Sequence, residues 1–140
     1  MSSIEIRIPG EPVAQARHRT SFKGGKQRQY DPSAIAKKDM LRAARDQHPS
    51  HVPYAGPLSA SIVFCLARPA SHFRADGNVK PKMLDALPTK RPDIDNLSKG
   101  LLDAMNGFIY LDDKQITSLC ASKIYGTRAY TWAKFTEIEA

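Results

Sequence analysis

The sequence predicts an α+β fold: a small mixed, mostly antiparallel sheet with two helices in the chain order β-α-β-α-β-β. Three observations lead to this prediction. Apolar residues alternate with period two in four short runs, and they recur at helical spacing in two other segments. The chain has 140 residues, which suits a single domain that buries roughly two thirds of its unfolded surface. Elements in this order favour an α+β layer formed by residues 1–140 as one domain.

The chain is expected to begin with a strand and a polar loop. Apolar residues alternate over residues 3–8 and the alternation stops at Pro9-Gly10, which predicts the first strand. Residues 14–30 are polar and rich in cations, so we expect a solvated loop or, alternatively, a mobile loop that contacts DNA. Phe22 and Tyr30 are expected to anchor this loop to the core, with stacking on unpaired bases as the alternative.

A helix, a strand and a long loop are predicted next. Asp31 and Pro32 suit the N-cap and first position of a helix that runs to about Gln47. Alternation over residues 58–66 predicts the second strand. Residues 68–90 have no usable period and contain several prolines and cations, so they are predicted to form a flexible basic arm that becomes ordered on DNA.

The last third of the chain predicts one helix and two strands. Residues 96–106 have helical periodicity, and Asp95 or Asn96 can cap the helix. The apolar face of this helix consists of residues spaced by four: Leu97, Leu101 and Met105. Alternation predicts the last two strands at residues 115–125 and 129–138.

Four aspartates flank the second predicted helix: Asp93 and Asp95 before it, and Asp112 and Asp113 after it. Pro92 disfavours helical geometry around it, so the first pair is expected to project to one side of an extended segment. About three helical turns, ended by Gly107, would return the second pair to the first. Ionised carboxylates this close repel one another, so the cluster needs a cation such as Mg²⁺ or Mn²⁺.

Each of these residues also has a purely structural explanation. Asp93 can end a strand, Asp95 can cap the helix, and Asp112-Asp113 can form a turn. Lys99 can form a helix-surface pair with Asp103 four residues later, or it can direct its ammonium at a phosphate beside a metal site. Spacing alone does not decide between the two explanations of Lys99.

Composition indicates a polyanionic partner. Lys and Arg number 21 against 14 acidic residues, for a net charge of +7, and a field of this sign favours DNA. Cys65 and Cys120 are expected to be buried thiols in a reducing compartment, and the four histidines show no metal-ligand spacing. No stretch approaches the length and apolarity of a membrane span or signal peptide, so a cytoplasmic location without membrane contact is expected.

Several motifs together carry a family resemblance. They are Pro92-Asp93-Ile94-Asp95-Asn96-Leu97, Lys99, Leu102-Asp103-Ala104, Leu111-Asp112-Asp113, Gln115-Ile116, Lys123, and the opening Pro9-Gly10-Glu11-Pro12-Val13 with Arg17 and Arg19. This pattern resembles the RusA-type Holliday junction resolvases, the crossover-junction endodeoxyribonucleases common in prophages. The resemblance covers most of the chain and is densest from Arg91 to Gln115.

The resemblance implies a small homodimer that cuts four-way DNA junctions with Mg²⁺, for which Mn²⁺ can substitute, during recombination and repair. Carried over residue by residue, it implies three metal-binding catalytic carboxylates: Asp93, Asp95 and Asp113. It makes Lys99 a catalytic or phosphate-contacting lysine and Asp112 a neighbour that supports the ligands. The long segment of residues 69–90 departs from the compact members of the family, so DNA contacts cannot be carried over from the family to this segment.

From the residues themselves, DNA contacts are expected from cations in two segments. The cations are Arg17, Arg19, Lys23, Lys26 and Arg28 in the first segment, and Lys80, Lys82 and Lys90 in the second. Flexible arginines and lysines can follow a phosphate backbone. Two other functions remain open: a Mg²⁺-dependent nuclease for other branched or duplex DNA, and a non-catalytic DNA-binding module whose aspartates are caps and turns.

Overall fold

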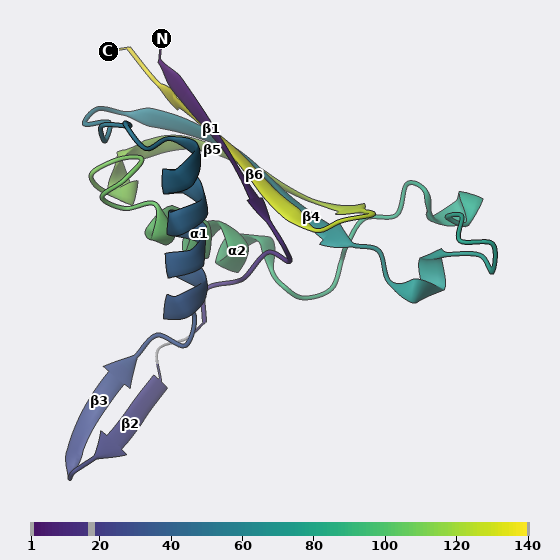
Figure 1. The fold of residues 1–140 in the computed structure, drawn as a ribbon, viewed down its shortest axis with the longest axis horizontal. Coiled ribbons are helices and arrows are strands. Elements are labelled where there is room, and N and C mark those ends of the chain that lie inside the picture. Colours follow the sequence, from purple (N-terminus) through teal and green to yellow (C-terminus); the bar gives the residue numbers. More distant parts are fainter. Residues whose placement is uncertain (1, 17–18, 140) are drawn as a thin grey trace.

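A four-stranded mixed sheet forms the centre of the fold. The computed structural model describes residues 2–16 and 19–139, and Figure 1 shows the sheet with both helices on one side. The strands are β1 (Ser3–Pro9), β4 (Leu58–Ala67), β5 (Ile116–Gly126) and β6 (Tyr130–Glu137). Their order across the sheet is β1-β6-β4-β5; β4 and β5 are parallel, and the other two neighbouring pairs are antiparallel. The predicted α+β class is confirmed.

Two helices, α1 (Ala34–Gln47) and α2 (Ile94–Ala104), pack against the sheet. Together with the four sheet strands they follow the predicted order β-α-β-α-β-β. Helix α1 begins at Ala34 rather than at Pro32, because Ser33 takes the N-cap position while Asp31 accepts hydrogen bonds from the backbone and hydroxyl of Ser33. Among the described residues, neither helix is long and apolar enough to cross a membrane.

The core lies between the sheet and the helices. The predicted apolar face of α2 is buried, with Leu97, Leu101 and Met105 each at most 1% exposed. The N-terminal segment crosses α2, since the Gln15 amide donates to the Asn96 carbonyl at 2.9 Å. A Cβ at Gly100 would stand 3.2 Å from the Gln15 nitrogen. Gly100 therefore lets this segment lie directly on the helix.

A β-hairpin occupies the region that was predicted to be a loop at residues 14–30, so that prediction is wrong for most of the segment. Strands β2 (Arg19–Lys23) and β3 (Lys26–Tyr30) pair antiparallel and project from the body of the molecule (Figure 1). Gly24 and Gly25 join them with φ values of +62° and +77°. Left-handed backbone at both central residues is what a two-residue hairpin turn requires, and glycine adopts it without strain.

Residues 68–90 form a second protrusion, which we call the arm. It contains two short 3₁₀ turns, η1 (Ala70–His72) and η2 (Pro81–Met83). The Arg68 guanidinium donates to the carbonyls of Met83 at 2.8 Å and Leu84 at 3.1 Å, and the Lys80 amide donates to the His72 carbonyl at 2.8 Å. These hydrogen bonds join the two sides of the arm, so it is more structured than the flexible segment expected from the sequence.

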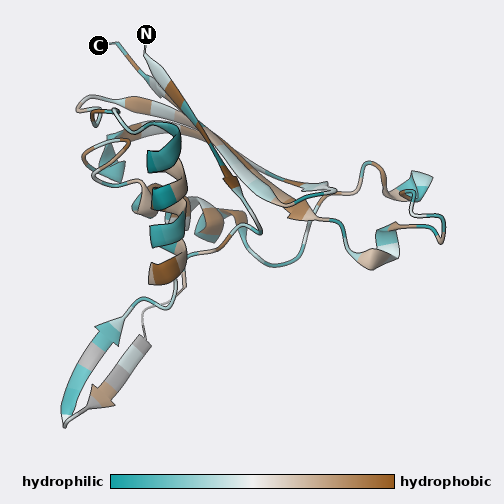
Figure 2. Cartoon of the chain, viewed as in Figure 1, coloured by the Kyte–Doolittle hydropathy of each residue, from teal (hydrophilic) through white to brown (hydrophobic). Residues whose placement is uncertain are grey.

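Strand β3 of the hairpin differs in hydropathy from the sheet. Figure 2 shows hydrophobic residues along the sheet strands and α2, whereas β3 is hydrophilic.

Both cysteines are free thiols. Cys65 is buried as expected, but Cys120 is exposed, and the prediction of burial is wrong for it. Cys120 pairs with Ser61 on the neighbouring strand, another exposed position, and the preceding residues of β5, Ser118 and Leu119, are exposed as well.

Candidate active site

Helix α2 carries the first part of the carboxylate motif. The helix begins at Ile94, two residues earlier than predicted, with Asp93 as the N-cap residue. The prediction that Asp93 and Asp95 share one side of an extended segment is therefore wrong, because Asp95 lies in the first helical turn. Asp95 and Lys99 are four residues apart on the helix, so they lie on the same face, and both are exposed.

The chain after α2 returns Asp113 to this helix. Gly107 has a φ of +80° and allows the chain to turn. The short 3₁₀ turn η3 (Asp113–Gln115) follows, capped by a reciprocal arrangement in which Asp112 accepts from the Lys114 amide and Gln115 accepts from the Asp112 amide. The Asp113 amide donates to the Asn106 side chain at 2.8 Å. The position of Asp113 is thus set by hydrogen bonds from backbone amides of the turn to side-chain oxygens.

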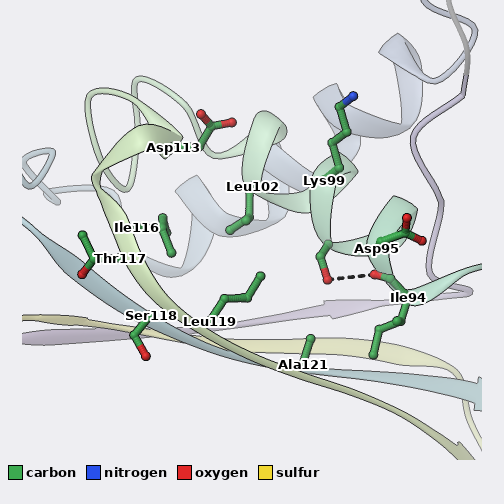
Figure 3. A pocket seen from close by; sticks show the side chains of 11 residues that line it. Ile94, Asp95, Lys99, Leu102, Asp113, Ile116, Thr117, Ser118, Leu119 and Ala121 are labelled. Atoms are coloured by element: carbon green, nitrogen blue, oxygen red, sulfur yellow. Dashed lines mark hydrogen bonds between the residues drawn. The ribbon is translucent and has the colours of Figure 1, made fainter.

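Asp95, Lys99 and Asp113 line one cavity of about 570 Å³. Figure 3 shows these three side chains around α2, with apolar residues between α2 and β5. The remaining lining residues are Ile94, Ser98 and Leu102 of α2, and Ile116, Thr117, Ser118, Leu119 and Ala121 from β5. The cavity therefore combines an apolar floor with two carboxylates and one ammonium.

Asp93 lies outside this cavity. It lines a different one, of about 730 Å³, with Ala14, Arg91, Pro92 and Asn96. Within the described residues, no group of three or more His, Cys, Asp or Glu side chains is placed to hold a metal ion. Two of the three predicted ligands, Asp95 and Asp113, thus line the same cavity, whereas Asp93 lies at the start of α2 and lines another.

The electrostatics of the two neighbouring aspartates differ. Burial, and then the adjacent Asp112 carboxylate, raise the pKa of Asp113. The backbone amide of Lys114, followed by the Asp113 side chain, lowers the pKa of Asp112. In the part of the chain that the structure describes, neither Asp95 nor Asp113 forms an ion pair within 4.0 Å. Negative charge at Asp113 is therefore under-compensated by the protein itself.

This donor set fits Mg²⁺ or Mn²⁺. Mg²⁺ is commonly held by one or two carboxylates, with the rest of its ligands supplied by water and by phosphates of the substrate. Asp95 and Asp113 supply two carboxylates at one cavity, and the raised pKa of Asp113 indicates a carboxylate that a cation would stabilise in its ionised form. Two carboxylates are enough for a site that is completed by a nucleic-acid phosphate.

Lys99 does not form a surface pair with Asp103, which was one of the two explanations that spacing left open. Asp103 instead accepts from Lys37 of α1 at 2.6 Å. Lys99 lies between the cavity described above and a second cavity, of about 470 Å³, that is lined by Asp113, Asn96 and Lys37 among others. The structural explanation of Lys99 as the partner of Asp103 is therefore wrong, and its ammonium is available to a ligand.

Two lysines near the site were not assigned a role from the sequence. The Lys37 ammonium lies 2.6 Å from a carboxylate oxygen of Asp31 and 2.6 Å from one of Asp103. The Lys123 ammonium donates to the carbonyls of Lys90 at 3.0 Å and Pro92 at 2.9 Å, immediately before Asp93. The available signal for Lys123 was its place among the residues that carry the family resemblance, whereas Lys37 is one of several cations on α1.

The cations expected to contact DNA fall on the two protrusions. The hairpin contains Arg19, Lys23, Lys26 and Arg28, and the arm contains Lys80, Lys82 and Lys90. Lys26, Lys82 and Lys90 are exposed, and Lys80 is half-buried. Arg17 lies outside the described residues.

Comparison with known proteins gives two matches. A family model described as endodeoxyribonuclease RusA matches residues 9–132. The chain is also 32% identical over 142 residues to a protein of Bacillus subtilis (strain 168) named uncharacterized protein YqaN, and this match spans all of both chains. The range matched by the family model includes Asp95, Lys99 and Asp113.

Proposed function

Since this chain belongs to the RusA endodeoxyribonuclease family, we propose that it resolves four-way DNA junctions by paired, metal-dependent nicks. The family consists of hydrolases of DNA that act on branched junctions. The finer statements, namely paired nicking, dependence on Mg²⁺ and a homodimer with two symmetric sites, are our proposal for this chain. A two-fold dimer would present its two sites to two opposing strands of the junction.

The proposal is supported by one observation: Asp95 and Lys99 of α2 and Asp113 of η3 all line a single cavity. Two carboxylates beside a lysine suit phosphodiester hydrolysis, because the carboxylates can hold a hard cation while the ammonium faces a phosphate oxygen. In a chain with a net charge of +7, unpaired carboxylates at one cavity are otherwise unfavourable for binding a polyanion.

Each residue of the site has a distinct role in the proposed reaction. Asp95 and Asp113 would bind Mg²⁺ through their carboxylate oxygens, and Asp93, two residues before Asp95, is the third proposed ligand. When bound, Mg²⁺ would neutralise charge on the scissile phosphate and activate water for attack. Lys99 would hold its ammonium against a phosphate oxygen and offset the charge that develops in the transition state.

The surrounding chain keeps these groups in place. Asn106 fixes the backbone of Asp113, and Asp112 caps η3 while adding negative charge beside it. Lys123 holds the backbone that precedes Asp93. The hairpin and the arm extend from the body on different sides of α2 (Figure 1). Their cations would contact phosphates of the junction arms on either side of the site.

The experiment compares cleavage of a labelled four-way junction with that of a linear duplex of the same sequence, in Mg²⁺ and in EDTA. The wild type should nick opposite strands of the junction only, and only with metal. Asp95→Asn should reduce the rate by about 10³-fold, because metal stabilisation of the transition state supplies several kcal/mol. Junction binding in EDTA should persist or tighten, since the variant removes negative charge near phosphate.

Asp39→Asn is the matched control, because it makes the same chemical change at an exposed position of α1. Its cleavage rate should equal that of the wild type. Cleavage of the linear duplex as fast as the junction would identify a nuclease that does not select branched DNA. A wild type that binds the junction but never cuts it with Mg²⁺ or Mn²⁺ would leave a DNA-binding module whose aspartates are caps and turns.

A further inference from the structure

The β2–β3 hairpin has two chemically different faces. Directly opposite residues of an antiparallel pair lie on the same face, and successive residues of a strand lie on opposite faces. The register pairs Phe22 with Gln27 and Thr20 with Gln29. All charged positions of the hairpin belong to the other three pairs: Arg19 with Tyr30, Ser21 with Arg28, and Lys23 with Lys26. One face therefore has four cationic positions, and the other has an aromatic residue among uncharged ones.

Phe22 is the only apolar residue of the uncharged face, and it is 76% exposed. Its neighbours on that face, Thr20, Gln27 and Gln29, are exposed as well. The expectation that Phe22 anchors this segment to the core is therefore wrong. A phenylalanine held in water at the end of a protruding ribbon contributes no packing to the fold, and its ring is free to stack on a ligand.

The base of the hairpin is tied to the helix that carries Asp95. Asp31 follows β3 directly and accepts from Lys37 at 2.6 Å, and the same ammonium lies 2.6 Å from Asp103 of α2. We call these three residues the clamp. The side chains of Lys37 and Asp31 are only 13% and 15% exposed. The clamp therefore sets where the hairpin leaves the body relative to the site.

We propose that the hairpin recognises the branch point of the junction, with Phe22 stacking on a base that is exposed there. This inference rests on the proposed junction substrate and names the residue that would recognise its branch. The cationic positions would follow a phosphate backbone on one face of the ribbon, while Phe22 meets a base on the opposite face. Linear duplex keeps its bases stacked on one another, so it offers Phe22 no partner.

A base is a better partner for this ribbon than an apolar protein surface. Four cationic positions on so short a hairpin complement phosphates, whereas protein interfaces are depleted of charge at their cores. Stacking on an aromatic ring is tolerant of sequence because every base has a flat face. The expected result is a preference for branched structure, independent of the sequence at the branch.

The test measures binding in EDTA, where no strand is cut, to a four-way junction and to a matched linear duplex. Phe22→Ala should weaken junction binding roughly tenfold, about 1.4 kcal/mol, within the range for loss of one stacked base. Duplex binding should change less than about twofold, because the cations that bind phosphate remain. Phe22→Trp should restore the preference for the junction. Since Phe22 is exposed, thermal unfolding of both variants should match the wild type.

Val52→Ala is the control, because Val52 is equally exposed, at 77%, but lies outside the hairpin. Its junction binding should equal that of the wild type. If Phe22→Ala weakens junction and duplex alike, or weakens neither, the inference is overturned while the junction substrate stands. If light scattering without DNA shows that Phe22→Ala splits a dimer, Phe22 belongs to a protein interface instead. A wild type with no preference for the junction would overturn the proposed function together with this inference.

Discussion

Helix α2 and the β2–β3 hairpin are held in place by different means. The inner face of α2 is buried, with Leu97 and Leu101 at most 1% exposed. In the hairpin, every residue whose burial is described is exposed, and its connection to α2 is the clamp at its base. The proposed metal ligands therefore stand on the core of the protein, whereas the proposed DNA contacts stand on a protrusion.

The difference follows from what each group must do. Metal ligands and catalytic groups need positions accurate to roughly 0.5 Å, which elements packed on a core can provide. Cations that bind a phosphate backbone tolerate looser placement, because phosphates recur along DNA and the attraction acts over a Debye length of about 8 Å at physiological salt. Substitutions in the two regions should consequently differ in kind: those around α2 should abolish chemistry, and those in the hairpin should change recognition.

The largest effect is expected at the site. Asp113→Asn should reduce junction cleavage by about 10³-fold, because it removes one of two carboxylates at the cavity. The double variant with Asp95→Asn should be little slower than either single variant, since the two residues act as a unit. Because burial and Asp112 raise the pKa of Asp113, its ionised form costs stability at neutral pH, so the variant should also unfold at a slightly higher temperature.

Cleavage rates at a saturating concentration of junction would check the loss of activity. Melting curves at neutral pH would check the rise in unfolding temperature. Asp112→Asn is the matched variant, because asparagine keeps a side-chain oxygen that can cap η3. It should retain most of the activity. Cleavage that is lost equally in both variants would indicate that the reaction needs the negative charge of Asp112 as much as that of Asp113.

A smaller effect is expected at the clamp that joins the two regions. Lys37→Met should lower the free energy of unfolding by about 1–2 kcal/mol, between the values for exposed and buried ion pairs, because Asp31 and Asp103 lose their shared partner. It should also reduce the preference for junction over duplex in binding, because the base of the hairpin is released. Lys38→Met, at an exposed neighbouring position, should do neither.

The free energy of unfolding that Lys37→Met loses should depend on pH in a defined direction. The hydrogen bond from Lys37, followed by that from Ser33, lowers the pKa of Asp31 below its ordinary value of 3.8. A lowered carboxyl pKa stabilises the fold above the ordinary value and stops doing so as the pH falls towards the folded-state pKa. The difference between wild type and Lys37→Met should thus be full at neutral pH and shrink below about pH 4 in denaturant titrations. A difference independent of pH would assign the loss to packing of the lysine stem.

The sheet and α2 were predictable from the sequence because each buries one face. Period two in β1 and period four in α2 record which residues meet the core. The length of α2 and the turn at Gly107 predicted that Asp113 would lie on the same side of the molecule as Asp95, and the two residues line one cavity. The hairpin residues whose burial is described are all exposed, and the two runs show no apolar alternation. The hairpin's only local signal was the Gly24-Gly25 pair, a two-residue turn between two short polar runs.

The details of the site were harder to predict because they depend on competition and on distant contacts. Asp93, Asp95 and Asn96 all suit an N-cap, and spacing does not rank them. In the folded chain the Leu97 amide donates to the Asp93 carbonyl at 3.0 Å, and Ile94 packs against the core. Lys37 and Asp103 are 66 residues apart, so no local pattern connects them.

The smallest effects are expected from single cations on the two protrusions. Lys26→Ala in the hairpin and Lys82→Ala in the arm should each lower the slope of log affinity against log salt by about 0.9, the value for one duplex phosphate contact. Both lysines are exposed, so stability should not change. Binding to the junction in EDTA, followed by fluorescence anisotropy across a salt series, measures the slope for each variant.

Lys134→Ala is the control for these two variants, because Lys134 lies on β6, 4.0 Å from Glu5, away from both protrusions. Its slope should equal that of the wild type. A slope lowered by Lys26→Ala but not by Lys82→Ala would restrict phosphate contacts to the hairpin and remove the arm from the DNA interface. The reverse result would leave the cationic face of the hairpin without a partner. In that case the arm, and not the hairpin, would be the protrusion that contacts DNA phosphates.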